Sequence, residues 1–286
     1  MILGITSPAS QNTKEELKNG VEYLKEKGIK VVIGKSCYRY LSTKERAEEL
    51  YELDDLCDAI LCSRGGCGSF NLLEYLDRPF RKNIIGYSDI TALLLFQLKH
   101  DAKAIHGPML LDYKKSGSLD NLIDVLENGI KKGQTFESRM NSICLIKGNA
   151  EGKAVPVNLS LLMTVKDNIT HEKIFRDSIL IIEDVEESVC SIERYLWQLT
   201  SIKEFNMVRG VIFGGFTKTQ ESSNPYGLMD VLKNFASRLN KPCFLGFPTY
   251  HGKFYKTSIP VGMRIHMDSE NGIVKSIDSF EKISGS

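Results

Sequence analysis

Two short segments of the sequence combine residue types that could catalyse acyl transfer. The first is the glycine-rich stretch SRGGCGS at 63–69, and the second is GYSD at 86–89, which stands between a short apolar run and an apolar helical pattern. Glycines let a backbone approach a ligand closely, so the first segment could present N–H groups to an anion or to a developing oxyanion. A structural glycine turn is the alternative. Phosphate binding is not favoured, because the P-loop lysine and the dinucleotide fingerprint spacing are both missing.

Ser88 has two interpretations at this position. Ser88 or Asp89 could cap the helix that is expected to begin at Ile90, which would stabilise it by about 1 kcal/mol. Alternatively, a serine on a tight strand-to-helix turn projects its hydroxyl from the sheet, beside helix N–H groups that could bind a tetrahedral oxyanion. The usual glycine pattern of a nucleophile elbow is absent, since Asp89 and Ile90 follow Ser88. Spacing alone leaves both interpretations open.

A serine nucleophile needs a base, and the base needs a group that orients it. His106 ends an expected strand, and His251 lies in a Gly/Pro-rich loop, so either could serve as the base. Glu183 and Asp184 end a strand that is expected to be buried, where a carboxylate is either a capping group or a functional one. The remaining histidines are expected to be solvated or structural: His100, His171 and His266.

Strands and helices alternate over roughly the first 110 residues, which predicts right-handed βαβ units and a mostly parallel sheet. T-x-x-E and S-x-x-E patterns at Thr13 and Ser42 predict capping boxes for two helices. Because ligands bind at the carboxyl ends of parallel strands, both segments should lie on the functional edge of this sheet. The expected strands are ILGIT, IKVVIG, DAILCS, NIIGY and KAIHG, and the expected helices include SFNLLEYL and ITALLLFQL.

The rest of the chain mixes strands and helices less regularly, which predicts an α/β fold with two domains. An N-terminal mostly parallel, Rossmann-like sheet flanked by helices should span 1–115, a linker region 116–150, and a smaller mixed α/β domain 151–286. Asn271-Gly272 predicts a hairpin. Trp197 falls in a helical pattern that is typical of core residues. The other expected elements are SLDNLIDVLENGI, SILIIE, SIERYLWQLTSI, VRGVIFGGF and NPYGLMDVLKNFASRL.

Composition excludes several classes of protein. The chain has 286 residues, with 37 basic and 36 acidic side chains, so no nucleic-acid or anionic-membrane partner is expected. Its seven cysteines are scattered without a CxxC pair, which favours reduced thiols over a zinc site or a disulfide framework. The opening MILGITSPAS has no basic region and too short an apolar run for a signal peptide, and no later stretch reaches membrane-spanning length, so a cytoplasmic protein is expected.

Several segments, taken in their order along the chain, resemble those of the LD-carboxypeptidase family of serine peptidases, which includes the microcin C self-immunity peptidases. The resemblance extends over nearly the whole chain, and six matching segments in the same order make it specific. These are SRGGCGSFNLLEYLD, IIGYSDITALL, AIHGPM, VNLSLL, ILIIEDVEESVCSIERYLWQL and GFPTYHGKFYKTSIPVG.

The resemblance implies a Ser-Glu-His triad that falls on Ser88, Glu183 and His251, with no metal and no cofactor. It also implies an oxyanion hole formed by the N–H groups of Gly66 and Asp89, in a cleft between the two domains. His251 would take the Ser88 proton and Glu183 would orient the imidazole, so that an acyl-enzyme forms and is then hydrolysed. The substrate it implies is a murein tetrapeptide, from which terminal D-alanine is released during peptidoglycan recycling, and it implies a homodimer.

Four further residues are candidates for substrate binding: Arg64, Gly65, Asn158 and Tyr250. Arg64 could pair with the substrate's terminal carboxylate or could instead close the glycine loop. The sequence departs from the family at Cys67, at Pro156-Val157 and at Tyr250, which affects the expected substrate preference. Two other functions fit the same pattern: an immunity-type peptidase that cleaves an aminoacyl-nucleotide toxin, and a protein that binds murein peptides without turnover.

Overall fold

The computed structural model describes residues 1–114, 117–169, 171–220 and 226–283, and it divides into two compact units. Unit 1 comprises Met1–Ile130, Tyr255–Val261 and Phe280–Ser286, and unit 2 comprises Lys131–Phe254 and Gly262–Ser279. The expected α/β organisation in two domains is confirmed. The two units cover similar lengths of the chain, and the expected linker region is divided between them at residue 130. The boundaries at 115 and 150 stay a prediction.

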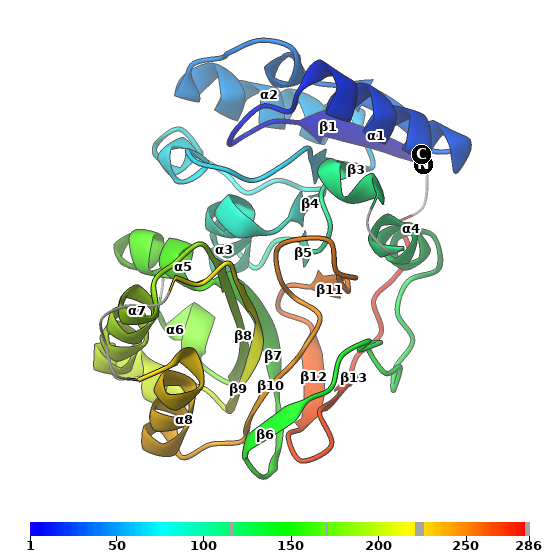
Figure 1. The fold of residues 1–286 in the computed structure, drawn as a ribbon. Coiled ribbons are helices and arrows are strands. Elements are labelled where there is room, and N and C mark those ends of the chain that lie inside the picture. Colours follow the sequence, from blue (N-terminus) through cyan, green and yellow to red (C-terminus); the bar gives the residue numbers. More distant parts are fainter. Residues whose placement is uncertain (115–116, 170, 221–225, 284–286) are drawn as a thin grey trace. The chain divides into compact units, whose positions relative to one another are not determined.

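Unit 1 is built on a mostly parallel sheet, as expected. Its described strands form a six-stranded sheet in the order β11-β5-β4-β3-β1-β2, and only β11 runs antiparallel to its neighbour (Figure 1). Its elements are β1 (Ile2–Thr6), α1 (Lys14–Glu26), β2 (Lys30–Ile33), α2 (Thr43–Leu56), β3 (Ala59–Cys62), η2 (Phe70–Glu74), β4 (Asn83–Gly86), η3 (Ser88–Ile90), α3 (Thr91–Lys99), β5 (Ala104–His106), α4 (Ser118–Asn128) and β11 (Ile259–Pro260), with further 3-10 turns η1 (Lys35–Cys37) and η4 (Leu110–Lys114).

Helices cover both faces of this sheet, and each face has its own apolar core. On one face α1 and α4 pack against alternate strand residues such as Ile5, Leu61 and Ile85. On the other face α2 and α3 pack against Ile60 and Ile84. Successive strand residues point to opposite faces, which is why neighbouring positions of β3 belong to different cores. Strand β3 therefore lies buried between two helical layers.

The local capping signals of the sequence are confirmed. The Thr13 side chain accepts from the Glu16 amide, and the Ser42 side chain accepts from the Glu45 amide, each with the reciprocal bond of a capping box. Because β3 and β4 are parallel neighbours, the glycine-rich stretch and the Ser88 turn leave the sheet at the same edge, as the sequence predicted.

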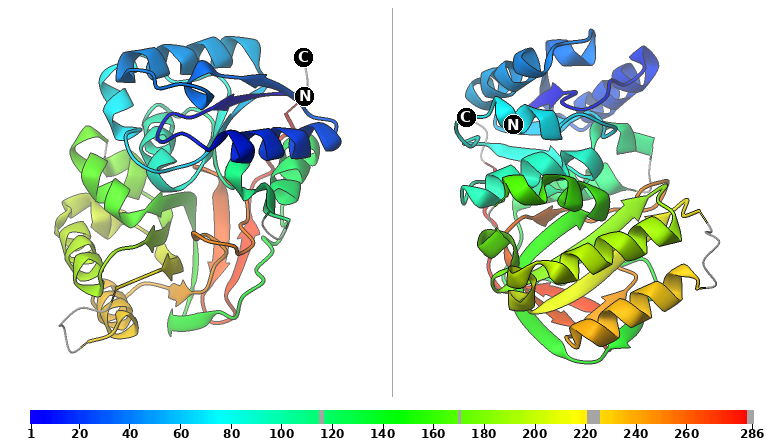
Figure 2. Two further views of the ribbon diagram at one scale, coloured as in Figure 1. Left: turned by 45° about the horizontal axis from the view of Figure 1, so that its top comes forward. Right: turned by 90° about the vertical axis from the view of Figure 1, so that its left-hand side faces the viewer.

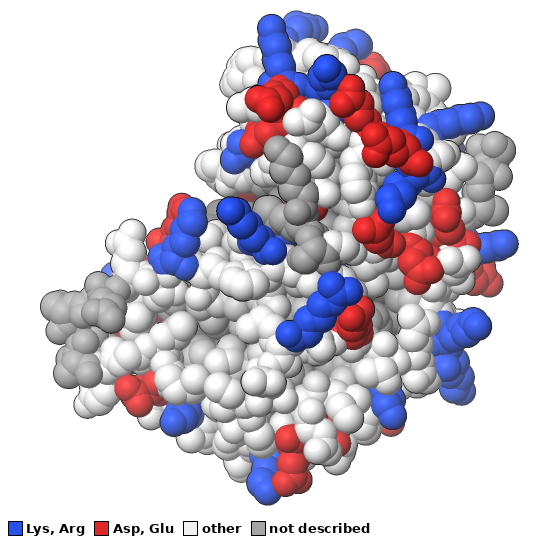
Figure 3. Space-filling model, turned by 45° about the vertical axis from the view of Figure 1, so that its right-hand side comes forward, with Lys and Arg blue, Asp and Glu red and all other residues white. Residues whose placement is uncertain are grey.

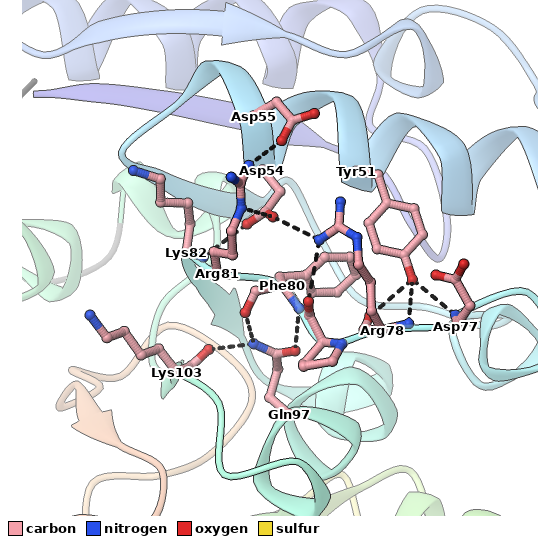
Figure 4. A network of polar contacts seen from close by, with 11 residues as sticks. Tyr51, Asp54, Asp55, Asp77, Arg78, Phe80, Arg81, Lys82, Gln97 and Lys103 are labelled. Carbon is pink, nitrogen blue, oxygen red and sulfur yellow. Dashed lines mark hydrogen bonds and ion pairs between the residues drawn. The ribbon is translucent and has the colours of Figure 1, made fainter.

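A polar network holds the connection that enters β4. The buried Asp54 carboxylate accepts from the Lys82 amide at 2.8 Å and pairs with Arg78 and Arg81 (Figure 4). On the same connection, the buried Gln97 side chain of α3 accepts from the Phe80 amide and donates to its carbonyl. These bonds satisfy buried polar groups and fix the start of the strand that delivers Ser88.

Unit 2 contains a mixed sheet. Its described strands form a seven-stranded sheet in the order β13-β12-β7-β8-β9-β10-β6, in which β7 to β10 are parallel. Helices α5, α7 and α8 gather on one face of it (Figures 1 and 2). The elements are β6 (Ile143–Ile146), β7 (Asn149–Asn158), α5 (Leu159–Val165), η5 (Lys166–Asn168), α6 (His171–Phe175), β8 (Ser178–Val185), α7 (Val189–Ser201), η6 (Lys203–Met207), β9 (Gly210–Thr217), α8 (Leu228–Leu239), β10 (Cys243–Leu245), β12 (Arg264–Asp268) and β13 (Ile273–Ser276).

Two sequence predictions in unit 2 have clear outcomes. The hairpin at Asn271-Gly272 is confirmed, because β12 and β13 pair antiparallel on either side of it. The helix expected from 224 begins at Leu228 instead, and Asn224 and Pro225 lie outside the described residues.

Charged side chains of both signs are interspersed on the face of the molecule in Figure 3. In the part of the chain that the structure describes, no helix is long and apolar enough to cross a membrane. The near balance of basic and acidic residues is thus reflected in a mixed surface on this face.

Candidate active site

The Ser88 turn is a strained strand-to-helix junction. Strand β4 ends at Gly86, Tyr87 stays extended, and Ser88 adopts a left-handed backbone with φ of 63° before η3 leads into α3. Such a conformation costs a residue with a side chain about 1–2 kcal/mol. Gly86 makes the turn possible, because a Cβ there would lie 2.9 Å from Cγ2 of Ile90. Strain of this kind is characteristic of a serine that must be exposed at the edge of a sheet.

Neither Ser88 nor Asp89 caps the helix, so the capping interpretation is wrong. Helix α3 begins at Thr91, and its first turn has no side-chain cap. The Asp89 carboxylate is buried and instead accepts from the Ser69 amide at 2.7 Å, while the Ser69 hydroxyl donates to the Asp89 carbonyl. Burial raises the pKa of Asp89. The Asp89 side chain thus ties the Ser88 turn to the end of the glycine-rich stretch.

The glycine-rich stretch lies directly against Ser88. A Cβ on Gly65 would lie 2.9 Å from both Cβ and Oγ of Ser88 and 3.6 Å from the Asp89 amide nitrogen. Gly66 and Gly68 have φ of 120° and 112°, where side chains are rarely tolerated. The glycines are therefore required both for close approach and for backbone conformation, and the backbone of the stretch lies beside the Ser88 side chain.

Arg64 and Cys67 of the glycine-rich stretch both form hydrogen bonds with the loop after β1. Nη1 of Arg64 donates to the Gln11 carbonyl at 3.3 Å, which is the loop-closing role considered for it. The exposed Cys67 donates its amide to Oγ of Ser10 at 3.3 Å. Carboxylate recognition by Arg64 stays a prediction.

Unit 2 brings Glu183 and His251 together. The Glu183 carboxylate at the end of β8 is fully buried, and its Oε2 lies 2.7 Å from Nδ1 of His251. In the tautomer that carries its proton on Nδ1, this N–H donates to the carboxylate and Nε2 is the basic nitrogen of the ring. The pair therefore has the arrangement of a general base and its orienting group.

The loop that carries His251 must cross β9 to reach Glu183. It leaves β10, whose neighbour β9 separates it from β8. The crossing occurs at Gly214 and Gly215, where a Cβ on Gly214 would overlap the Thr249 carbonyl oxygen and one on Gly215 would lie 2.6 Å from Cβ of Tyr250. The Gly215 amide also donates to the Thr249 carbonyl at 2.9 Å. Sequence reasoning missed this role of the two glycines in VRGVIFGGF, although their presence in a buried strand was the available signal.

Asn158 braces the carboxylates of unit 2. Its Nδ2 donates to Oε1 of Glu183 at 3.2 Å and to Oδ1 of Asp184 at 2.9 Å, and its own oxygen accepts from the Leu161 amide. Strand β7 runs through Pro156 and Val157 and pairs Asn158 with Glu183. Asn158 therefore has a bracing and helix-capping role in the structure, and its expected contact with substrate stays a prediction.

Asp184 is a second buried carboxylate beside Glu183. Burial, and then the neighbouring Glu183 charge, raise its pKa to about 6. Amides of Ser160 and Val185 donate to it at 2.9 and 2.8 Å. The carboxyl is thus satisfied by hydrogen bonds and yet takes up a proton more readily than an exposed aspartate does.

Two aromatic residues differ in their surroundings. Tyr250 is buried, its hydroxyl contacts the Met140 sulfur, and its ring meets Phe254 edge-on at 5.4 Å. The expectation that Trp197 lies in the core is wrong, because its side chain is 62% exposed. Trp197 lines a groove of about 430 Å³ between α7 and α8, and no candidate site residue lines that groove.

Family models match most of the chain. The LD-carboxypeptidase N-terminal domain matches residues 3–107, and the LD-carboxypeptidase C-terminal domain matches residues 151–267. Together they cover both candidate parts of the site, including the Ser88 turn and the pair of Glu183 and His251.

Individual relatives are distant but cover nearly full length. The chain is 26% identical to the murein tetrapeptide carboxypeptidase of Pseudomonas aeruginosa, over 92% of this chain and 94% of that protein. It is 29% identical to the microcin C7 self-immunity protein MccF of Escherichia coli, over 96% and 92%. The muramoyltetrapeptide carboxypeptidase of Oxalobacter formigenes has the same fold, with a TM-score of 0.82 at 23% identity over 99% and 100% of the two chains.

These matches define a serine carboxypeptidase, a hydrolase with a two-domain α/β fold. The chain belongs to the LD-carboxypeptidase family.

The crossing at β9 generates a first prediction. Gly214→Ala should displace the Thr249 backbone and with it His251, and overpacking of this kind costs about 1–3 kcal/mol of unfolding free energy. Gly227→Ala is the control without a backbone clash, since only a side-chain oxygen 3.8 Å away would meet its Cβ, and as the N-cap change of α8 it should cost less than about 1 kcal/mol. Urea unfolding at pH 7 measures both variants. Equal free energies of unfolding for the two variants would contradict the requirement for glycine where the loop crosses β9.

The raised pKa of Asp184 generates a second prediction. Between pH 4 and pH 6 the native protein binds more protons at this group than the unfolded chain does, so its contribution to stability is present at pH 4 and is lost as the pH rises through about 6. Relative to Asp184→Asn, the wild-type free energy of unfolding should fall by up to about 3 kcal/mol over this window. The measurement is urea unfolding at several pH values.

The control for this prediction is Asp167→Asn, which changes a side chain that is 78% exposed in the same unit. Its pH profile should follow that of the wild type. If Asp184→Asn also follows the wild-type profile, the assignment of the raised pKa is wrong.

Proposed function

We propose that this protein releases terminal D-alanine from murein tetrapeptides by acyl transfer through Ser88, His251 and Glu183. The observation that carries the proposal is the left-handed backbone of Ser88, held at the sheet edge with the Gly65 backbone against its side chain. Similarity to murein peptide carboxypeptidases over nearly the whole chain supports the substrate class.

The chemistry follows from the groups in each unit. Oγ of Ser88 attacks the carbonyl carbon of the L-D peptide bond while Nε2 of His251 takes its proton. Amides of Gly66 and Asp89 stabilise the oxyanion, and Glu183 stabilises the imidazolium. D-alanine leaves with the proton from His251, and water then hydrolyses the ester on Ser88 with His251 again acting as the base.

The chain itself ties the base to the unit that carries the nucleophile. His251 belongs to unit 2, and only four residues later Tyr255 begins a segment of unit 1. Four residues span at most about 14 Å. Within unit 1 this segment is anchored by a buried ion pair of Lys256 with Asp112 at 3.2 Å, and the Lys256 ammonium lies 5.1 Å from the ring centroid of Tyr87, the residue before Ser88. The loop that carries His251 therefore continues along the chain directly into unit 1.

The proposal includes the setting in which the enzyme works. All seven cysteines are free, which fits the reducing cytoplasm. A homodimer and the role in peptidoglycan recycling rest on the resemblance to the family.

A second candidate substrate is an aminoacyl-nucleotide, supported by the 29% identity to a microcin C7 self-immunity protein. Such a substrate needs a platform for its base. The exposed Trp197 is aromatic, but the groove that it lines contains none of the candidate catalytic residues. The murein tetrapeptide is therefore the favoured substrate, and a side-by-side assay of both compounds separates the two activities.

The nucleophile assignment gives a third prediction. Ser88→Ala should lower kcat for D-alanine release by at least about a thousandfold, because the variant lacks the hydroxyl that is proposed to form the acyl-enzyme. Ser201→Ala, at an exposed position at the end of α7, is the matched control and should retain wild-type kcat. Turnover by Ser88→Ala at the rate of Ser201→Ala would refute the assignment, and peptide binding by the wild type without product would favour a non-catalytic binding protein.

A further inference from the structure

The loop after β1 packs against the glycine-rich stretch through Ser10. The Ser10 amide donates to the Gly65 carbonyl at 3.3 Å, and the Ser10 hydroxyl accepts from the Cys67 amide at 3.3 Å. These two bonds bracket Gly66 on both sides. Ser10 therefore restrains the peptide groups before and after the residue whose N–H is the candidate oxyanion donor.

The bond to the Gly65 carbonyl also determines where the Gly66 N–H points. The carbonyl oxygen of Gly65 and the N–H of Gly66 belong to one planar trans peptide, so they point in opposite directions. Since the oxygen is directed at Ser10, the N–H is directed away from Ser10. On the other side of the stretch, a Cβ on Gly65 would lie 2.9 Å from Oγ of Ser88.

Ser10 is packed as closely as the backbone allows. A Cβ on Gly66 would lie 2.5 Å from Cβ of Ser10 and would overlap its hydroxyl oxygen, and Gly66 has φ of 120°. The Ser10 side chain thus fills the space beside Gly66 that a side chain would otherwise occupy. A rotation of the peptide groups around Gly66 would break a bond to Ser10.

The loop that carries Ser10 is itself held firmly. Nη1 of Arg46 donates to the Pro8 carbonyl at 2.5 Å and to the Ala9 carbonyl at 3.3 Å. The Ser7 hydroxyl bonds to that of Ser63 at 2.6 Å. Restraint on Ser10 is therefore transmitted from α2 as well as from the glycine-rich stretch.

We propose that Ser10 is a positioning residue that holds the Gly66 N–H as an oxyanion donor beside Ser88. The inference rests on the proposed function, because that function supplies the oxyanion. Loss of an entire oxyanion donor costs about a hundredfold to a thousandfold in kcat. Loss of the Ser10 hydroxyl leaves the Gly66 donor present but less restrained, so a smaller effect, about tenfold, is expected.

The test compares Ser10→Ala with Gln11→Ala. Gln11 lies in the same loop, but its side chain donates to the Ser36 carbonyl and not to the glycine-rich stretch. Two rates are measured: D-alanine release from a murein tetrapeptide, and labelling of Ser88 by a fluorophosphonate. In the labelling reaction Oγ of Ser88 bonds to phosphorus as His251 takes its proton, the P–F bond breaks and fluoride leaves, and the developing charge falls on the phosphoryl oxygen.

Ser10→Ala should lower both kcat and the labelling rate about tenfold, and its KM should stay within about twofold of wild type. Gln11→Ala should change neither rate by more than about twofold. Ser10→Cys retains a weaker acceptor, so both of its rates should lie between those of wild type and Ser10→Ala. If the alanine variant is unstable, reduced rates in Ser10→Cys test the same inference. Wild-type rates in Ser10→Ala, equal losses in both loop variants, or a change confined to KM would overturn the inference.

The two readouts separate this inference from the proposed function. If the wild type labels at Ser88 but releases no D-alanine, the proposed substrate is wrong, and the labelling rates of the three variants still decide the role of Ser10. If the fluorophosphonate does not label Ser88 in the wild type, both the nucleophile assignment and the role of Ser10 are refuted.

Discussion

The position of His251 depends on two adjacent glycines in β9, Gly214 and Gly215. The loop after β10 can reach Glu183 on β8 only by crossing β9, and it crosses where Gly214 and Gly215 present no side chain. The crossing also satisfies the buried carboxylate, because His251 and Asn158 supply hydrogen bonds to its two oxygens. A buried carboxylate without such partners would be costly. The same contact therefore stabilises unit 2 and produces an oriented imidazole.

In unit 1, glycines likewise allow segments of the backbone to approach one another closely. Gly86 lets the Ser88 turn fold tightly over Ile90, and Gly65 lets a neighbouring backbone lie against Ser88. The left-handed conformation of Ser88 is unfavourable in itself, and the surrounding bonds of Asp89 with Ser69 hold the turn in place. In both units glycines allow close approach near the carboxyl ends of parallel strands, and hydrogen bonds of the buried carboxylates Asp89 and Glu183 hold the adjoining loops in place.

Local features were predictable from the sequence because their causes are local. The capping boxes at Thr13 and Ser42, the hairpin at Asn271-Gly272 and the parallel sheet of unit 1 depend on residues close together in the chain. The placement of Ser88 at a strand-to-helix turn was likewise predictable from the sequence. The hydrogen-bond partner of the Asp89 side chain was not predictable, because Ser69 lies twenty residues away and helix capping was an equally good local explanation.

Long-range features required either the resemblance or the structure. Spacing could not choose between His106 and His251, since the pairing with Glu183 joins residues 68 apart. The return of Tyr255–Val261 to unit 1 depends on an edge pairing of β11 with β5, and no local pattern specifies it. Trp197 shows the limit of periodicity, because a helical position that is apolar in sequence can still face solvent.

A double-mutant comparison tests most directly whether Ser88 and His251 act together in catalysis, as we propose. D-alanine release is measured for Ser88→Ala, His251→Ala and the double variant. Residues that act as a unit give non-additive losses, so the double variant should be no slower than the slower single variant. A double variant slowed by the product of the two single effects would show that Ser88 and His251 act independently and would contradict the account.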